Sequence, residues 1–257
     1  MSMRDRETLD MVKDALRRRN VVLAYQPIVN AARPDRPAFY EGLLRVLDPS
    51  GRIIPARDFI GAVETHETGR ILDCLALELG LAALADNPTL RIAINMSARS
   101  IGYARWNAVL EEGLSRDPTT AERLILEITE SSAMLMPEIV TAFMADLQGR
   151  GIAFALDDFG AGYTAFRYFK EFDFDFVKID GQFIRGIPHS PDNQVLTRAL
   201  VSIARHFGMF TIAESVETAD EAAFLTALGV DCLQGYHFGA PTIEPVWAEG
   251  KTQRRAG

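Results

Sequence analysis

The chain repeats one pattern along its length: a short apolar run, a turn, and then an amphipathic stretch with helical periodicity. This repetition constrains the fold more than any other feature of the sequence. The apolar runs predict eight strands, at Val21–Gln26, Ala38–Leu44, Arg91–Asn95, Leu124–Ile128, Ile152–Asp157, Phe174–Ile179, Phe210–Glu214 and Val230–Gln234. Several of them are almost continuously apolar or β-branched, as is typical of strands covered on both faces.

The amphipathic stretches between these runs have apolar residues three and four positions apart, which predicts helices. The expected helices span Ala56–Glu64, Ile71–Ala85, Ala104–Leu114, Pro137–Gln148, Asn193–Phe207 and Asp220–Leu228. Gly149, Gly208 and Gly229 stand where three of these helices should end. Strands that alternate with helices indicate parallel βα units, and the absence of a glycine-rich phosphate loop favours a closed barrel over an open, doubly wound sheet. We therefore expect an α/β fold, a single-domain TIM-like (β/α)8 barrel with its active site at the C-terminal ends of the strands.

The length of 257 residues fits one such barrel. We expect an N-terminal helix and lead-in at 1–20, the barrel at 21–248 and a polar tail at 249–257.

The apolar runs are far shorter than the ~20 residues that span a bilayer, and the charged N-terminus lacks a signal-peptide core, so a cytoplasmic location is expected. The net charge of −8 and the lack of a long basic run argue against a polymeric nucleic acid as partner. Cys74 and Cys232 lie far apart in apolar stretches, which predicts buried free thiols.

Polar residues interrupt the predicted strands or end them. They are Glu41, Asn95, Glu127, Asp157, Lys178, Glu214 and Gln234. Burying an isolated carboxylate is costly, so four carboxylates on separate strands are difficult to explain by packing alone. In a parallel barrel these strand ends converge on one mouth, where carboxylates repel each other unless cations neutralise them. Oxygen ligands without His or Cys favour Mg²⁺ or Mn²⁺, and a structural ion-pair network is the alternative.

Asp157 and Asp158 are consecutive in one predicted strand. Neighbouring residues of a strand face opposite ways, so both can serve one site only where the strand ends. The following residues include Gly160 and Gly162, which predict that break. One carboxylate that bridges two cations ~3.5–4 Å apart, with its neighbour on the second cation, would suit displacement at a phosphoester. The structural alternative is an Asp that caps the next helix.

Seven sequence blocks, in a fixed order between about Tyr25 and Pro241, resemble the EAL-domain family of cyclic di-GMP phosphodiesterases. The blocks are YEGLLR around Glu41, INMS at Ile94–Ser97, LEITES at Leu126–Ser131, DDFGAGY at Asp157–Tyr163, VKID at Val177–Asp180, AESVET at Ala213–Thr218 and QGY at Gln234–Tyr236. The resemblance implies metal-dependent hydrolysis of cyclic di-GMP to linear pGpG by two-metal activation of water. A catalytically weak or inactive EAL domain that acts as a cyclic di-GMP sensor is the alternative.

The resemblance also implies a role for each matching position. The metal ligands would be Glu41, Asn95, Glu127, Asp157 and Asp158, with Asp157 bridging two ions. The residues implied in catalysis are Glu41, Asp157, Asp158, Lys178, which would orient the water, and Glu214. The substrate-binding residues would be Gln26, Leu43, Arg45, Asp180, Gln234 and Tyr236, and Glu130 would anchor the DDFGAGY loop. The implied cofactors are two Mg²⁺ or Mn²⁺ ions, with inhibition by Ca²⁺. The implied partners are cyclic di-GMP, a second copy docked near that loop, and a sensory or cyclase domain in a longer parent protein.

The chain departs from the family pattern at a few positions. Gly42 replaces an Ala, Val46 stands where an aromatic is common, and Ser215 replaces a Gly, while Ala165 and Phe166 alter the tail of the loop. None of the implied metal ligands is missing. We expect these departures to tune affinity or rate without abolishing catalysis.

Overall fold

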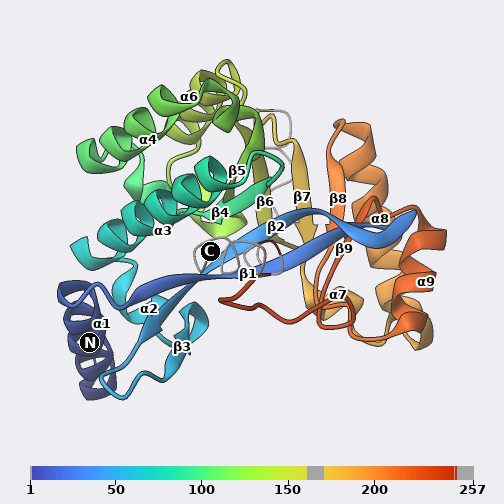
Figure 1. Cartoon of the computed structure of the whole chain (residues 1–257). Coiled ribbons are helices and arrows are strands. Elements are labelled where there is room, and N and C mark those ends of the chain that lie inside the picture. Colours follow the sequence, from blue (N-terminus) through green and yellow to red (C-terminus); the bar gives the residue numbers. More distant parts are fainter. Residues whose placement is uncertain (1, 161–170, 246, 248–257) are drawn as a thin grey trace, which may run out of the picture.

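A barrel of strands forms the centre of the protein, which we describe from a computed structural model covering residues 2–160, 171–245 and 247 (Figure 1). The strands are β1 (Val21–Asn30), β2 (Arg33–Leu47), β3 (Ile53–Pro55), β4 (Ile92–Asn95), β5 (Leu124–Thr129), β6 (Ala153–Phe159), β7 (Phe176–Ile179), β8 (Phe210–Ala213) and β9 (Cys232–Gln234). Their order within this part of the chain is β1-β9-β8-β7-β6-β5-β4-β2-β3, and β1 also pairs with β2. That last pairing closes eight strands into a barrel, which confirms the predicted fold.

The barrel is parallel from β2 through β4 to β9, but β1 runs antiparallel to both of its neighbours, β2 and β9. The reason is the short connection between β1 and β2, which leaves room for a hairpin and not for the helical crossover that joins parallel strands. The two arms of this hairpin cross the front of the molecule in Figure 1. The strand β2 therefore begins earlier than predicted, at the exposed Arg33.

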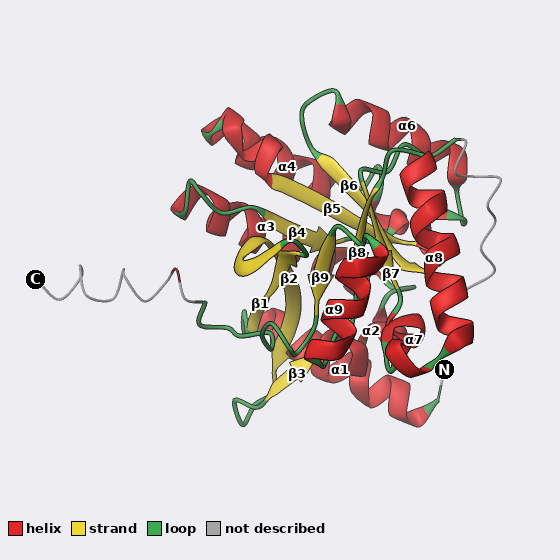
Figure 2. Cartoon of the chain, turned by 90° about the vertical axis from the view of Figure 1, so that its right-hand side faces the viewer, coloured by secondary structure: helices red, strands yellow, loops and turns green. Residues whose placement is uncertain are grey.

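Helices surround the barrel (Figure 2). They are α1 (Met3–Arg17), α2 (Ile60–Val63), α3 (Glu67–Asp86), α4 (Ala104–Arg116), α5 (Glu130–Ala133), α6 (Pro137–Gln148), α7 (Gly181–Ile184), α8 (Pro191–His206) and α9 (Ala219–Leu228). Five of the six predicted helices match these bounds within a few residues. The sixth, predicted at 56–64, is divided between a 3₁₀ turn at Ala56–Asp58 and α2. Among the described residues, none of these helices combines the length and the apolar character needed to cross a bilayer.

The inner face of the barrel has two layers. The lower layer is apolar and contains Ile28, Phe39, Ala93, Ile125, Ala155, Ile212 and Cys232. Side chains two positions apart along a strand point to the same side, so the residue two positions further along each parallel strand also points inward. These next residues are Glu41, Asn95, Glu127, Asp157, Glu214 and Gln234. The interior thus changes from apolar to polar within one step along each strand, at the C-terminal end.

Larger clusters of apolar residues fill the space between the strands and the helices. Cys74 and Cys232 are buried and free, as predicted. Some predicted features lie outside the described residues: the polar tail at 249–257, and Gly162, Tyr163, Ala165 and Phe166 of the loop that follows Gly160.

Candidate active site

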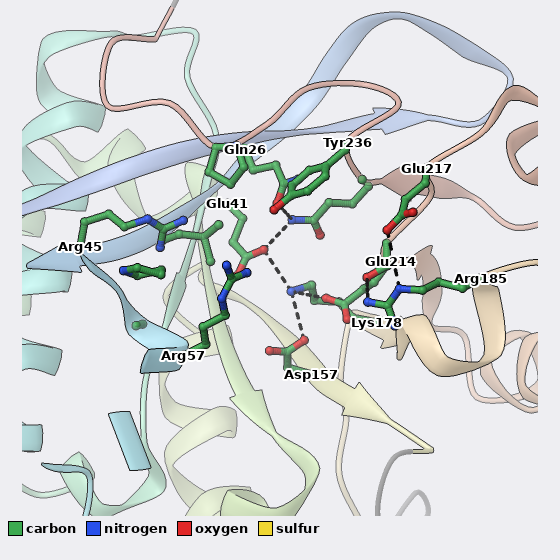
Figure 3. A pocket seen from close by; sticks show the side chains of 17 residues that line it. Gln26, Glu41, Arg45, Arg57, Asp157, Lys178, Arg185, Glu214, Glu217 and Tyr236 are labelled. Atoms are coloured by element: carbon green, nitrogen blue, oxygen red, sulfur yellow. Dashed lines mark hydrogen bonds and ion pairs between the residues drawn. The ribbon is translucent and has the colours of Figure 1, made fainter. Parts of the chain in front are cut away.

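Lys178 lies at the centre of the polar layer, among four carboxylates from four other strands or strand ends. Figure 3 shows it with three of them, Glu41, Asp157 and Glu214. Its Nζ is 3.2 Å from a carboxylate oxygen of Glu41, 2.9 Å from Glu127, 3.0 Å from Asp157 and 2.8 Å from Glu214. The Lys178 side chain is only 1% exposed. One ammonium group therefore holds together carboxylates that are far apart in the sequence.

Amide side chains complete the hydrogen bonding of Glu41. Asn95 Nδ2 donates to Glu41 Oε1 at 2.7 Å, and Gln234 Nε2 donates to Glu41 Oε2 at 2.6 Å. Gln234 Nε2 also lies 3.1 Å from Gln26 Oε1, and Gln26 Nε2 donates to the backbone carbonyl of Gly239 at 3.1 Å. This chain of contacts orients the Glu41 carboxylate from both sides.

A bulge in β6 brings Asp157 and Asp158 to the same mouth. The pairing of β6 with β7 joins Leu156 to Val177 and then Phe159 to Ile179, so the two Asp residues interrupt a regular ladder. Asp158 has φ +57°, in the left-handed region that Asp tolerates better than most residues. The predicted end of the strand at Asp157 is two residues short, because β6 continues to Phe159 and ends directly before Gly160, where the sequence predicts the break. The bulge lets two consecutive side chains serve one site, whereas in a regular strand they would face opposite ways.

The charges in this cluster raise some pKa values and lower others. Burial alone would lower the pKa of Lys178, but the nearby carboxylates, Asp157 foremost, raise it well above its ordinary value. Burial alone would raise the pKa of Glu41, but the Lys178 charge and hydrogen bonds from Gln234 and Asn95 hold that pKa below its ordinary value. Lys178 and Glu41 are therefore both charged at neutral pH.

In three other carboxyl groups the pKa is raised, which favours the protonated form. Burial, reinforced by the charge of Glu41, raises the pKa of Glu127 well above its ordinary value. Burial raises the pKa of Glu214 to about 8 and that of Asp158 to about 6, and the neighbouring Asp157 contributes to both shifts. The cluster thus carries more carboxylate than its single lysine can neutralise.

The residues of the cluster fit divalent metal ions. If all four carboxylates around Lys178 are ionised, three negative charges remain uncompensated. Glu127 Oε1 is buried and has no hydrogen-bond partner within the described ranges. Three carboxylate oxygens lie within 4.8 Å of one another, one each from Asp157, Asp158 and Glu214. Carboxylate and amide oxygens are the ligands that Mg²⁺ and Mn²⁺ prefer.

A pocket of about 470 Å³ opens above the cluster. Among the residues implied in substrate binding, it is lined by Gln26, Leu43, Arg45, Gln234 and Tyr236. Glu41, Asp157, Lys178 and Glu214 also line it, and the side chains of Lys178 and Glu41 are only 1% and 5% exposed.

Asp180 behaves differently from the other implied substrate-binding residues. It is the N-cap of α7, where its side chain accepts a hydrogen bond from the backbone N–H of Gln182 at 2.7 Å, and it is not among the residues that line the pocket.

The pocket also contains residues that the sequence did not single out. Arg57, just after β3, and Arg185, just after α7, both line it, as does Glu217. Arg57 and Arg45 lie on one side of the pocket, and Arg185 and Glu217 lie on the other (Figure 3). No pattern in a single sequence marks these arginines, because their positions depend on how the loops after two distant strands fold over the mouth.

Two departures from the family pattern have a packing explanation. A Cβ atom on Gly42 would lie 2.7 Å from Cδ1 of Ile94 and 3.1 Å from Cδ1 of Ile92. These isoleucines therefore occupy the space of the missing methyl group. Val46 is fully buried in the small core that includes Val12 of α1 and Phe59, away from the pocket.

Comparison with known proteins agrees with this geometry. Residues 9–241 match the model of the EAL domain family. The chain is 33% identical over 252 residues to the bifunctional diguanylate cyclase/cyclic di-GMP phosphodiesterase MucR of Pseudomonas aeruginosa, an alignment that covers 94% of this chain and 36% of MucR. The chain thus spans about a third of the length of this curated relative.

Solved structures extend the comparison. The fold is similar to that of the PaMucR phosphodiesterase in complex with c-di-GMP, with a TM-score of 0.79 and 31% identity over 92% of this chain and 97% of the other. It is also similar to a manganese and cyclic di-GMP complex of Klebsiella pneumoniae BlrP1, with a TM-score of 0.75 and 25% identity over 87% and 56% of the two chains. Because the family match extends over most of the sequence, this chain belongs to the EAL domain family.

Proposed function

We propose that the domain is a phosphodiesterase that hydrolyses cyclic di-GMP to linear pGpG by two-metal activation of water, and so lowers the level of a bacterial second messenger. The observation that carries the proposal is the group of four carboxylates around the buried Lys178 at the floor of the pocket. The names of the relatives support the choice of substrate. A sensor that only binds the ligand would have no need for so many buried, mutually repelling carboxylates.

The proposed cofactors are two divalent ions, Mg²⁺ or Mn²⁺. Glu41, Asn95, Glu127 and Asp157 would hold the first ion, and Asp157 and Asp158 would hold the second. Bound there, the ions would make hydroxide available at neutral pH and stabilise the charge that develops on the phosphate oxygens. The manganese complex of the BlrP1 relative supports this assignment.

The protein's own groups would then divide the remaining tasks. Lys178 stays charged and keeps the carboxylates in place, and its ammonium group can orient the attacking water. Bound cations would favour the ionised form of Glu214, which could then take the proton that the water gives up. Arg45 can donate to a phosphate oxygen with its planar guanidinium group. Glu130 accepts a hydrogen bond from the backbone N–H of Gly160 at 3.3 Å, which supports its proposed role as the loop anchor.

The direct test is turnover by the purified protein. Cyclic di-GMP is incubated with the protein and Mg²⁺ or Mn²⁺, and the products are resolved by chromatography. We expect pGpG, and we expect EDTA to suppress it. Intact ligand in the presence of protein that binds cyclic di-GMP would contradict the enzyme and support the sensor.

Ca²⁺ should bind to the same carboxylates but support little turnover. Its longer and more variable coordination places the attacking water less well than the tight octahedral shell of Mg²⁺ does. We expect the initial rate in Ca²⁺ to be below roughly a tenth of the rate in Mg²⁺. Ca²⁺ added to the Mg²⁺ reaction should also slow it, and an equal rate in the two metals would contradict this prediction.

Metal binding should release protons. Below pH 8 the Glu214 carboxyl is largely protonated, and below pH 6 that of Asp158 is as well, so protons compete with cations at this site. Because the raised pKa favours the protonated form, Mn²⁺ affinity should fall as the pH drops from 8, by about tenfold per pH unit for one titrating group. Calorimetric titration with Mn²⁺ at pH 7, in two buffers of different ionisation enthalpy, would measure the release. Glu214→Gln should reduce the dependence between pH 7 and 8, and an unchanged pH dependence in this variant would contradict the assignment.

A further inference from the structure

Ser215 has a backbone conformation that is unfavourable for a residue with a side chain. It follows Glu214 directly after β8 and has φ +56°, in the left-handed region that favours glycine. Glycine is the residue that the family resemblance leads one to expect there. The serine therefore brings a conformational cost, and its contacts indicate what the side chain does.

Gly181 provides the space that the Ser215 side chain occupies. A Cβ atom on Gly181 would lie 2.4 Å from Ser215 Oγ and 2.6 Å from Ser215 Cβ, distances that real Cβ atoms do not reach. Gly181 begins α7, after β7, and Ser215 follows β8, the neighbouring strand. The two residues are thus complementary, because the serine side chain fits only when residue 181 lacks one.

The Ser215 hydroxyl contacts Arg185. Arg185 Nη2 donates to Ser215 Oγ at 3.0 Å, and Arg185 Nε lies 3.7 Å from Glu217 Oε1. Both members of the ion pair are more than half exposed, so this long ion pair holds the arginine only weakly. A guanidinium group has five N–H donors, and within the described part of the chain these two contacts leave donors for a ligand in the pocket that Arg185 lines.

The distribution of charge around the pocket gives Arg185 a function. Arg45 and Arg57 lie on one wall of the pocket, and Glu214 and Glu217 lie on the other (Figure 3). A cyclic dinucleotide carries a negative charge on each of its two phosphodiesters, so the exposed Glu217 carboxylate on this wall would repel it. Arg185 is a cationic residue that lines the pocket on this same wall.

We propose that Arg185 binds a phosphate of the cyclic dinucleotide from the Glu214 side of the pocket, and that Ser215 acts as its positioning residue. This inference rests on the proposed function. The planar fork of a guanidinium group matches two phosphate oxygens, and a phosphate can displace the long, exposed contact with Glu217. Ser215 and Gly181 together hold the fork at the mouth, which offsets the unfavourable backbone of the serine.

The test measures the Kd of cyclic di-GMP by calorimetry in Ca²⁺, with chromatography to verify that the ligand stays intact. Removing a charged hydrogen bond to the ligand should weaken binding by about tenfold or more in Arg185→Gln. Arg185→Lys should recover part of the affinity, because it keeps the charge but not the fork. Arg198→Gln, on the exposed face of α8, is the matched control and should bind like the wild type.

Ser215→Gly tests the positioning role without damage to the fold, since glycine relieves the backbone. We expect binding to weaken by about threefold in this variant while the Tm stays the same or rises. In an Arg185→Gln background the same change should have no further effect on Kd, which a purely structural role would not predict. Wild-type affinity in Ser215→Gly overturns the positioning role.

Two outcomes separate this inference from the proposed function. If the wild type binds cyclic di-GMP and Arg185→Gln binds equally well, the inference fails and the phosphodiesterase stands. If the wild type binds no cyclic di-GMP, both fail.

The salt dependence of the Kd separates a phosphate contact from a base contact, because screening weakens an interaction between charges. The Kd of Arg185→Gln should therefore depend less on salt than that of the wild type or Arg185→Lys, and an equal salt dependence overturns the phosphate assignment.

Discussion

Glu41→Gln should reduce the turnover of cyclic di-GMP by on the order of a thousandfold, comparable to the loss of a key electrostatic contact in other enzymes. The change removes one negative charge from the group around Lys178 but keeps the size of the side chain. Both carboxylate oxygens of Glu41 accept hydrogen bonds, from Asn95, Gln234 and Lys178. The substitution replaces one of these two acceptor oxygens by an NH₂ group, which is a donor. One of these donors would therefore face another donor. The metal site would lose a ligand and its orientation together.

The measurement compares initial rates and ligand affinity in the same preparations. We expect Glu41→Gln to lose much more turnover than cyclic di-GMP binding, because the walls of the pocket remain intact. Glu78→Gln, an exposed position on α3, is the matched control and should keep the wild-type rate. A Glu41→Gln rate above about a tenth of the wild-type rate would contradict the role of Glu41. Mutating a residue that only hydrogen-bonds to a metal ligand typically lowers activity about 10–100-fold, and losing a ligand itself should lower it more.

The position of the site could be predicted from the sequence because it follows from strand periodicity. In Ile125–Glu127 and Ile212–Glu214, an apolar residue is followed two positions later by a charged one, and both must point the same way in a strand. Parallel strands then bring these ends to one mouth. The predicted carboxylates and Lys178 meet there within hydrogen-bonding distance. Local pattern and fold class were sufficient for this part.

Other features depend on contacts between distant segments, and the sequence could not indicate them. The antiparallel direction of β1 follows from its hairpin with β2, whose two connecting residues, Ala31 and Ala32, lack the Asn-Gly or Asp-Gly pair that marks a two-residue hairpin turn. The one local turn signal is Asn30, whose side chain accepts a hydrogen bond from the backbone N–H of Ala32 at 3.0 Å. The bulge at Asp158 needs a left-handed residue that its neighbours do not reveal. Arg185 lies five residues beyond the VKID block, and only the fold brings it beside Ser215.

Lys178→Met should destabilise the metal-free protein by about 3–5 kcal/mol, the usual effect of leaving a buried charge without its partner. The ammonium group contacts four carboxylates and is almost fully buried, and an apolar side chain of similar length cannot neutralise any of them. The carboxyl groups would have to take up protons instead. The loss of stability should therefore be larger at pH 8 than at pH 6. In a domain of this size it corresponds to a Tm lower by roughly 10 °C.

Mn²⁺ should restore more stability to Lys178→Met than to the wild type, because the ion supplies the positive charge that the variant lacks and has no lysine to compete with. Thermal unfolding with EDTA and with Mn²⁺, at both pH values, measures this difference. Lys13→Met is the matched control, because its exposed lysine has a single long contact of 3.9 Å with Asp10 and should change stability little. Equal Tm values for Lys178→Met and the wild type in EDTA would mean that the carboxylates are not held together by this lysine. An equal gain from Mn²⁺ in both proteins would mean that the cations bind away from it.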